Sequence, residues 1–131
     1  MRVVFDTNIF VSALAIPGGR ADEALQRIIE GNDDLLVSKA IILELLDVLA
    51  RKFARDSDEL SRVAVFVADL GEQVEPKGRI SILNDETDNR VLECAISGNA
   101  HLIVTGDKQM LNLGEHHGVR IVTLRDYLAK Q

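Results

Sequence analysis

Short apolar runs separated by longer segments of helical character are the feature that most constrains how this chain can fold. Each run is bounded by Gly, Asn, Asp or Ser, which is typical of buried strands. The runs are residues 3–5, 35–37, 102–104 and 119–122, with a weaker fifth at 73–75. Continuously apolar strands are buried on both faces, as in parallel sheets covered by helices. We therefore expect an α/β fold, a three-layer α/β/α sandwich around a mainly parallel sheet of four to five strands.

Seven segments between and after these runs have the periodicity of amphipathic helices. They span approximately residues 8–14, 21–30, 39–53, 58–70, 87–97, 108–111 and 124–129. Three residues suited to N-capping precede helices: Ser38, Ser57 and Thr123. Three glycines stand where helices should end: Gly31, Gly71 and Gly98. No repeat or linker divides the chain, so we expect one domain over residues 1–131.

Composition sets broad limits on function. The chain is 47% hydrophobic and 27% charged, the balance of an ordinary globular protein. No stretch approaches the roughly 20 apolar residues of a membrane span, and the N-terminus lacks the apolar segment of a signal peptide. We expect a cytoplasmic protein without membrane contact. The one cysteine, Cys94, lies in an apolar run and is interpreted as a buried hydrophobic residue rather than a nucleophile.

The net charge of −6 bears on any role with nucleic acid. An acidic surface repels a polyanion unless basic patches or bound cations intervene. Four Phe, one Tyr and no Trp provide too few aromatic rings for a base-stacking platform. Simple RNA-coating modules are therefore disfavoured.

Acidic residues follow two of the predicted strands. Asp6 comes directly after the first run, and Asp107 follows the third run after only Thr105 and Gly106. In a parallel sheet the carboxyl ends of the strands share an edge, and ligands bind there near the point at which the strand order reverses. Both carboxylates should therefore emerge at the same edge.

Two further acids can reach this edge. Asp88 stands at the entry to the helix before the third run, with Asp85 and Glu86 just upstream. Glu44, at about 100° per residue, falls at the border of the apolar stripe of its helix and can point towards the sheet edge. Taken singly, an Asp near a helix start suits capping, and Glu44 suits an ordinary boundary position. The combination of acids, rather than any one of them, favours a functional site.

Converging carboxylates raise an electrostatic problem. Their mutual repulsion forces protons onto some of them unless a cation occupies the site. A hard divalent ion such as magnesium suits a few carboxylates with open coordination positions, whereas soft ligands for zinc are nearly absent. Such an ion also attracts phosphate to an acidic protein. Candidate side chains for the flanking backbone are Arg51, Lys52, Arg55, Arg90 and Lys108.

Four stretches of the chain together resemble the PIN-domain family. They are residues 3–13, with Asp-Thr-Asn after the first strand, Ser38 followed by Glu44, residues 85–95, and residues 103–107 with Thr-Gly-Asp. The resemblance covers essentially the whole chain. It looks closest to the VapC-like toxin components of toxin–antitoxin systems, on residues 5–8 and the turn at residues 17–19.

This resemblance implies a PIN-like fold and a ribonuclease that cuts single-stranded RNA with Mg²⁺ or Mn²⁺. By position, the acidic quartet of the family corresponds to Asp6, Glu44, Asp88 and Asp107, with Asp85 in reserve for the third place. Its polar companions correspond to Asn8 and Thr105, which would orient a carboxylate or a bound water. The implied partners are RNA and an antitoxin, whose peptide would occupy a groove between neighbouring helices. A homodimer is the expected oligomer.

Two other functions stay open. An Asp after the first strand also accepts phosphate in aspartyl-phosphate transfer, although Asp6-Thr7-Asn8 lacks a second Asp two residues after the first. A non-catalytic scaffold for a protein partner is the other alternative, and the four acids argue against it because a scaffold has no use for their repulsion. The three histidines are interpreted as opening a strand or lying exposed in a turn: His101, His116 and His117.

Overall fold

One six-stranded sheet forms the centre of the computed structural model, which describes residues 1–129. The strand order is β3-β2-β1-β4-β6-β5, and every neighbouring pair is parallel except β5 and β6. The strands are β1 (Arg2–Phe5), β2 (Asp34–Val37), β3 (Glu72–Gln73), β4 (Leu102–Val104), β5 (Glu115–His116) and β6 (Val119–Val122).

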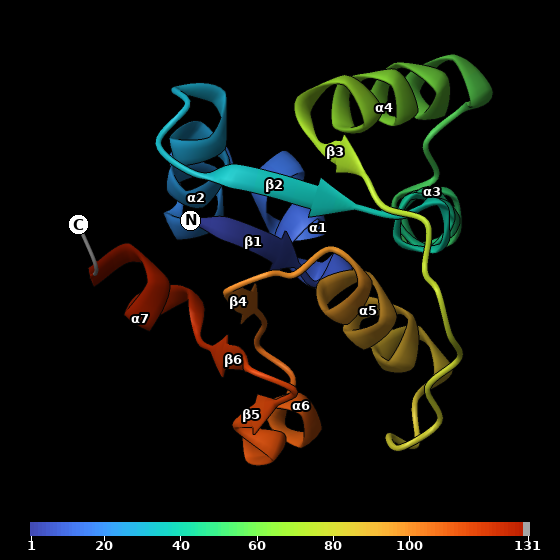
Figure 1. The fold of residues 1–131 in the computed structure, drawn as a ribbon. Helices are drawn as coiled ribbons and strands as arrows, with labels where there is room; N and C mark the ends of the chain where they lie inside the picture. Colours follow the sequence, from blue (N-terminus) through green and yellow to red (C-terminus); the bar gives the residue numbers. More distant parts are fainter. Residues whose placement is uncertain (130–131) are drawn as a thin grey trace.

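Helices cover both faces of this sheet. They are α1 (Thr7–Ala15), α2 (Arg20–Ile29), α3 (Lys39–Phe53), α4 (Ser57–Leu70), α5 (Glu86–Ser97), α6 (Lys108–Leu113) and α7 (Leu124–Ala129). Figure 1 shows α1 and α2 behind the sheet and α5 in front of it, where α5 packs against β1, β2 and β4. The predicted α/β/α sandwich is therefore confirmed. None of these helices, within residues 1–129, has the length and apolar character to span a membrane.

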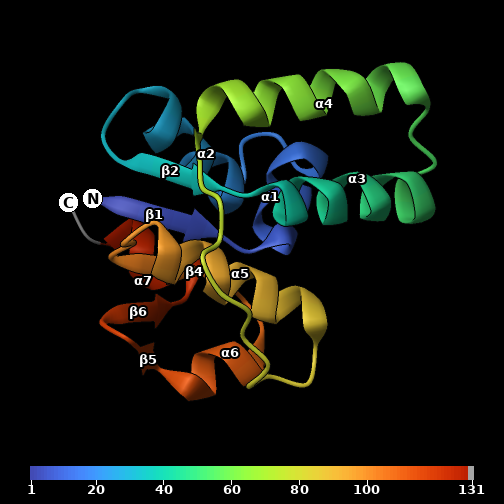
Figure 2. The ribbon, with the colours of Figure 1, turned by 45° about the vertical axis from the view of Figure 1, so that its right-hand side comes forward.

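The helices α3 and α4 form a pair of their own. They pack against each other, and Figure 2 shows them running side by side beyond the carboxyl ends of β1 and β2. α3 also contacts α1 on one side and α5 on the other. The carboxyl edge of the sheet therefore faces a space bounded by α1, α3 and α5.

Burial explains why the apolar runs become central strands. Residues 3–5, 35–37 and 102–104 are all at most 2% exposed, which is the pattern of strands covered on both faces. The ring of Phe5 packs against the rings of Phe10 and Tyr127, with centroids 5.7 and 5.9 Å away. These contacts join β1 to α1 and α7.

The strand order places a switch point at β1. From β1 the chain moves first to β2 on one side and later to β4 on the other, so the order reverses between β1 and β4. Ligands of open α/β sheets bind beyond the carboxyl ends of the strands at this kind of point. Phe5 pairs with Val104 there, so Asp6 and the residues after Val104 emerge side by side.

The sequence-based elements needed several corrections. The sheet has six strands rather than four to five, because the two-residue strand β5 forms a hairpin with β6 where only a turn was expected. The weak fifth strand lies at Glu72–Gln73 rather than residues 73–75. Asp56, not Ser57, caps α4, since its carboxylate accepts the backbone N–H of Glu59 at 2.9 Å. The helix bounds agree with expectation to within two residues.

Residues 74–85 form an irregular segment, here named the strap, that runs along α5. Side chains of α5 bind its backbone at three levels. The N–H groups of Lys77, Ile80 and Leu83 donate to Ser97 Oγ, Glu93 Oε2 and Asn89 Oδ1 at 2.9, 2.7 and 2.9 Å. A segment without regular secondary structure is thus fixed at regular intervals along the helix.

Candidate functional site

A cavity of about 560 Å³ opens at the switch point, and we name it the acidic cavity. All four acids of the predicted quartet and the reserve acid line it: Asp6, Glu44, Asp85, Asp88 and Asp107. Three basic residues also line it: Arg51, Lys52 and Lys108. The fold therefore brings together the acids that the sequence placed at two strand ends and on two helices.

Asp6 is held at the point where β1 meets β4. Its backbone N–H donates to Val104 O at 3.0 Å, which ties the two strand ends together. Its carboxylate makes no capping bond to α1 but accepts the hydroxyl of Thr105 at 2.6 Å. Burial raises the pKa of Asp6, outweighing the hydrogen bonds from Thr105 and the Thr7 N–H, and the charges of Asp107 and Asp85 add to the rise.

Thr105 links two of the acids. It is fully buried, and besides donating to Asp6 its Oγ1 accepts the backbone N–H of Asp107 at 3.0 Å. One hydroxyl thus fixes the carboxylate of one acid relative to the backbone of the other. The second polar companion, Asn8, lines the same cavity as an exposed residue, and within residues 1–129 its side chain has no hydrogen bond.

The two candidates for the third acid have different surroundings. Asp85 is exposed and caps α5, because its Oδ1 accepts both the N–H and the hydroxyl of Thr87 at 2.9 and 2.7 Å. Asp88 lies in the first turn and is 6% exposed. Its burial, a hydrogen bond with Asp107 and the charges of neighbouring acids raise its pKa from 3.8 to about 8. Asp88 is therefore the acid of this pair that faces the others.

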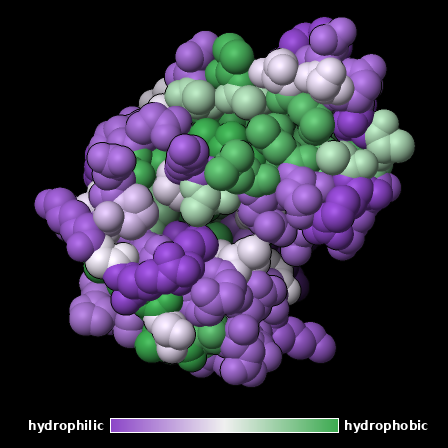
Figure 3. All heavy atoms as spheres, turned by 90° about the vertical axis from the view of Figure 1, so that its right-hand side faces the viewer, coloured by the Kyte–Doolittle hydropathy of each residue, from purple (hydrophilic) through white to green (hydrophobic). Residues whose placement is uncertain are grey.

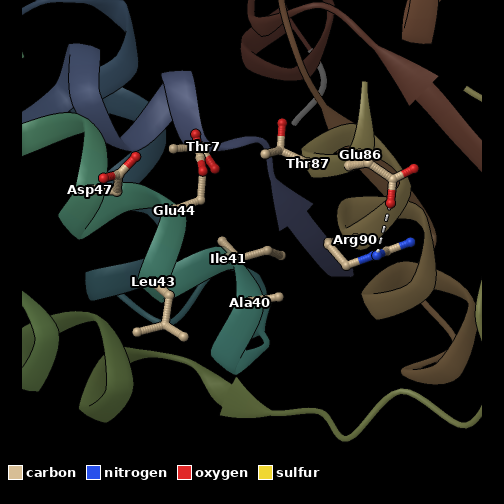
Figure 4. Close-up of a pocket in the computed structure, with 9 residues that line it drawn as sticks. All are labelled: Thr7, Ala40, Ile41, Leu43, Glu44, Asp47, Glu86, Thr87 and Arg90. Carbon is tan, nitrogen blue, oxygen red and sulfur yellow. Dashed lines mark hydrogen bonds and ion pairs between the residues drawn. The ribbon is translucent and has the colours of Figure 1, made fainter. Parts of the chain in front are cut away.

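Glu44 stands on the wall between two hollows. It lines the acidic cavity and also a pocket of about 260 Å³ between α3 and α5, named here the middle pocket. Figure 4 shows Glu44 projecting from α3 beside Thr7, with Thr87 and Arg90 on the α5 side. Burial and the charge of Asp47 raise the pKa of Glu44, while Arg51 opposes the rise.

Comparison with known proteins identifies this arrangement. A family model for the PIN domain matches residues 2–109, a span that contains every acid of the cavity. The chain belongs to the PIN-domain family. This PIN domain is 27% identical over 121 residues to an uncharacterized protein of Methanocaldococcus jannaschii, a match that covers 89% of this chain and 77% of that protein.

Two solved structures share the fold of this PIN domain. One is VapBC2 from Rickettsia felis bound to a DNA fragment from their promoter, with a TM-score of 0.66 at 16% identity over 94% of this chain and 98% of that one. The other is VapBC-1 from nontypeable Haemophilus influenzae, also with a TM-score of 0.66 at 16% identity, over 95% and 99%. At this identity the likeness concerns the fold.

The donor chemistry of the PIN domain fits a hard divalent ion. The acids offer only oxygen, the ligand type that Mg²⁺ and Mn²⁺ prefer. Within residues 1–129, Asp6, Asp88 and Asp107 have no ion pair with any Lys or Arg. In that same range, no group of three or more acidic, His or Cys side chains is already arranged to hold an ion. The interaction of Asp88 with the neighbouring carboxylate of Asp107 is instead one of the causes that raise the pKa of Asp88.

Other expectations about polar residues have mixed outcomes. Arg55 pairs with Glu59 at 2.6 Å and does not line the acidic cavity, and its part in holding the flanking backbone stays a prediction. Arg90 does not line that cavity either, because its guanidinium binds Glu93 at 2.9 Å. Sequence reasoning missed Thr87 as a lining residue, although its place one residue before Asp88 was a usable signal.

The cysteine and histidines play no part in the cavity. Cys94 is fully buried, which confirms its interpretation as a hydrophobic residue, and burial raises its pKa to about 12. His101 directly precedes β4, and its Nδ1 accepts the N–H of Arg2 at 3.0 Å. His117 is exposed as expected, but His116 is half-buried, since its ring packs edge-on against His117 with centroids 4.4 Å apart.

Proposed function

We propose that this PIN domain is a Mg²⁺- or Mn²⁺-dependent endoribonuclease that hydrolyses phosphodiester bonds of single-stranded RNA. The observation that carries the proposal is the convergence of Asp6, Asp88 and Asp107 on one cavity without a cationic partner from residues 1–129. Family membership supports nuclease chemistry for such a cluster. The acidic composition of the chain fits a site in which a bound cation attracts the phosphate.

Each residue of the cavity has a distinct part in this proposal. Asp6, Asp88 and Asp107 hold the ion, with Glu44 as the fourth acid at the rim. When bound, the ion lowers the pKa of water, polarises the phosphate and neutralises charge that develops in the reaction. Thr105 keeps the carboxylate of Asp6 in one orientation by its hydrogen bond of 2.6 Å. Such outer hydrogen bonds hold ligands in place before the ion arrives.

The basic residues at the same cavity suit the flanking RNA backbone. Lys52 and Lys108 have no ion pair within residues 1–129, so their charges are available to phosphate. Arg51 is shared, because its Nε binds Asp47 at 2.8 Å. An exposed pair of this kind is weak and exchanges readily for a phosphate contact.

We further propose that the chain is the toxin of a toxin–antitoxin pair that acts in the cytoplasm as a homodimer. The likeness in fold to the VapBC structures supports this role. Figure 3 shows a broad apolar surface over α3 and α4, where four large hydrophobic side chains are at least 39% exposed. They are Leu43, Phe53, Val65 and Phe66. We assign this surface to the antitoxin, because apolar patches of this kind mark protein interfaces.

The decisive experiment compares wild-type protein with Asp6→Asn on end-labelled single-stranded RNA. We expect cleavage with Mn²⁺ or Mg²⁺, none after chelation, and none by the variant purified in parallel. Equal cleavage by both proteins would show that a contaminating nuclease is responsible and would reject the proposal. A phosphoryl group trapped on Asp6 from a phosphate donor would instead support aspartyl-phosphate transfer. If neither activity is present, both catalytic functions are rejected.

The toxin role has its own test. Expression of the chain alone should arrest growth of the host cell, and Asp6→Asn should relieve the arrest. Co-expression with a small protein encoded next to it should also relieve the arrest and yield a stable complex. Val65→Lys should weaken that complex while leaving RNA cleavage intact, because Val65 is 60% exposed and lies outside the acidic cavity.

A further inference from the structure

A third hollow continues from the acidic cavity through the middle pocket. It has a volume of about 870 Å³ and lies between the first turn of α3 and the strap; we name it the basic groove. It shares Ala40, Leu43 and Arg90 with the middle pocket. The middle pocket in turn shares Glu44 and other residues with the acidic cavity. The three hollows therefore adjoin one another in a row along α3, and we call this row the path.

The charge along this path changes sign. The basic groove is lined by Lys39, Lys77 and Arg79, and the two lysines have no ion pair within residues 1–129. Arg79 lies 3.9 Å from Glu86, with both side chains largely exposed, so this pair is weak.

The acids beside these three cations do not cancel their charge. Glu93 also lines the groove, but it is 5% exposed and its carboxylate is occupied by Arg90 Nη2 and the Ile80 N–H at 2.9 and 2.7 Å. Glu75 is the remaining acid of the lining. The groove is thus a locally basic surface on a chain of net charge −6.

We propose that the basic groove binds backbone phosphates of the same RNA strand that is cut in the acidic cavity. This inference rests on the proposed function and extends it by giving the course of the RNA strand along α3. At about 1.5 Å per residue, the five positions from Lys39 to Glu44 span about 7.5 Å of helix axis. Nearby nucleotides of one strand can therefore reach both the basic groove and the rim of the acidic cavity.

The backbone of the strap is anchored to α5, which fixes the places from which the basic side chains of the groove extend. The N–H of Lys77 is bound to Ser97, and Ile80 is bound through its N–H by Glu93 and through its carbonyl by Arg90 at 2.9 Å. Lys77 and Arg79 thus extend from a segment anchored to α5. Between the two ends, the apolar residues Ala40, Ile41 and Leu43 of α3 line the middle pocket (Figure 4), and Leu43, which is 54% exposed, suits contact with the face of a base.

The test measures RNA binding apart from cleavage. We would add the triple substitution Lys39→Gln, Lys77→Gln and Arg79→Gln to the Asp6→Asn protein and measure the anisotropy of a labelled single-stranded RNA with Mn²⁺. A matched control removes three exposed basic residues that do not line the path: Arg62→Gln, Arg120→Gln and Arg125→Gln. Thermal unfolding verifies that both proteins are folded.

We expect the groove variant to bind at least about tenfold more weakly at roughly 0.1 M salt, and the control to bind like its parent. The slope of log affinity against log salt should become shallower by about 0.7 for each phosphate that the variant no longer neutralises. In the cleavage-competent protein, the same triple substitution should raise KM and leave kcat unchanged. Shortening the RNA at one end should weaken binding to the parent but not to the groove variant.

The possible outcomes distinguish a failure of this inference from a failure of the proposed nuclease function. If wild-type protein cuts RNA while the groove variant and the control bind it equally, the path is wrong and the nuclease assignment stands. If the groove variant loses self-association or antitoxin binding but keeps its RNA affinity, the groove is a protein interface and the inference is overturned. If wild-type protein neither binds nor cuts RNA, both proposals fail.

Discussion

Helix α5 carries two buried acids in opposite electrostatic settings. Glu93 is 5% exposed and Asp88 6%, so both carboxylates are largely shielded from water. Glu93 receives compensation from inside the chain, from the guanidinium of Arg90 and the N–H of Ile80. Asp88 instead faces Asp6 and Asp107, which carry charge of the same sign.

The difference separates a structural acid from a functional one. A buried charge that is paired inside the chain serves as a structural contact. Here Glu93 and Arg90 bind the N–H and the carbonyl of Ile80, which connects the strap to α5. A buried charge without one either takes up a proton or awaits a ligand, and the pKa of Asp88 is raised to about 8. Burial alone therefore does not mark the site, whereas burial without a counter-charge does.

The largest expected effect comes from the acids of the acidic cavity, which have no counter-charge. Asp107→Asn should lower the rate of RNA cleavage by about 10²–10³-fold, on the scale of losing a preorganised electrostatic group at a reacting phosphate. The measurement is single-turnover cleavage with Mn²⁺. Asp85→Asn serves as the matched control, because Asp85 is an exposed cap of α5. If Asp85→Asn abolished cleavage and Asp88→Asn did not, Asp85 would take the third place in the quartet.

Substitution of the structural acid, Glu93, should lower the stability of the protein rather than its activity. Glu93→Gln leaves Arg90 without its shortest ion pair and should lower the free energy of unfolding by about 2–3 kcal/mol. Urea unfolding measures this change. Glu59→Gln breaks the exposed pair with Arg55 and should cost less than about 1 kcal/mol. Similar stabilities for the two variants would contradict the assigned role of Glu93.

Thr105→Val should have a smaller effect, limited to metal affinity and cleavage at the acidic cavity. It removes the hydroxyl that donates to Asp6 and accepts the N–H of Asp107, with little change in side-chain shape. Losses from such supporting groups are typically about 10–100-fold in metal affinity or activity. A Mn²⁺ titration of cleavage measures the shift in midpoint. Thr123→Val, at the start of α7, is the control, and an equal shift in both would exclude a specific role for Thr105.

The last expected effect is a pH dependence of stability. Because its pKa is raised from 3.8 to about 8, Asp88 binds more protons in the folded chain than in the unfolded one between these values. The free energy of unfolding of the metal-free protein should therefore fall as the pH rises through this window. Asp88→Asn should flatten the dependence, as followed by Tm from pH 4 to 8. A wild-type Tm that rises over this range would contradict the raised pKa.

The sequence predicted the central architecture because apolar strands buried on both faces leave a strong pattern. It also placed Asp6 and Asp107 at one edge, since both follow strands that proved to be parallel neighbours. It missed β5 because a strand of two residues, Glu115–His116, has no period to detect. Such short edges are determined by hairpin pairing with β6 rather than by composition.

The meaning of charged residues on α5 was harder to predict. Arg90 was expected beside the RNA backbone, and the sequence did not reveal that it also pairs with Glu93 three positions later on the same helix. The useful signal was the acid itself, since Glu93 lies between the apolar residues Leu92 and Cys94 and had to be buried with them. Which buried acids obtain a counter-charge depends on tertiary contacts, and spacing along one helix does not reveal them.

A Mn²⁺-soaked crystal tests the central claim most directly, because anomalous scattering locates the ion without reference to activity. We expect a peak in the acidic cavity within coordinating distance of the carboxylates of Asp6 and Asp107. A cavity without manganese at saturating concentrations would contradict the claim.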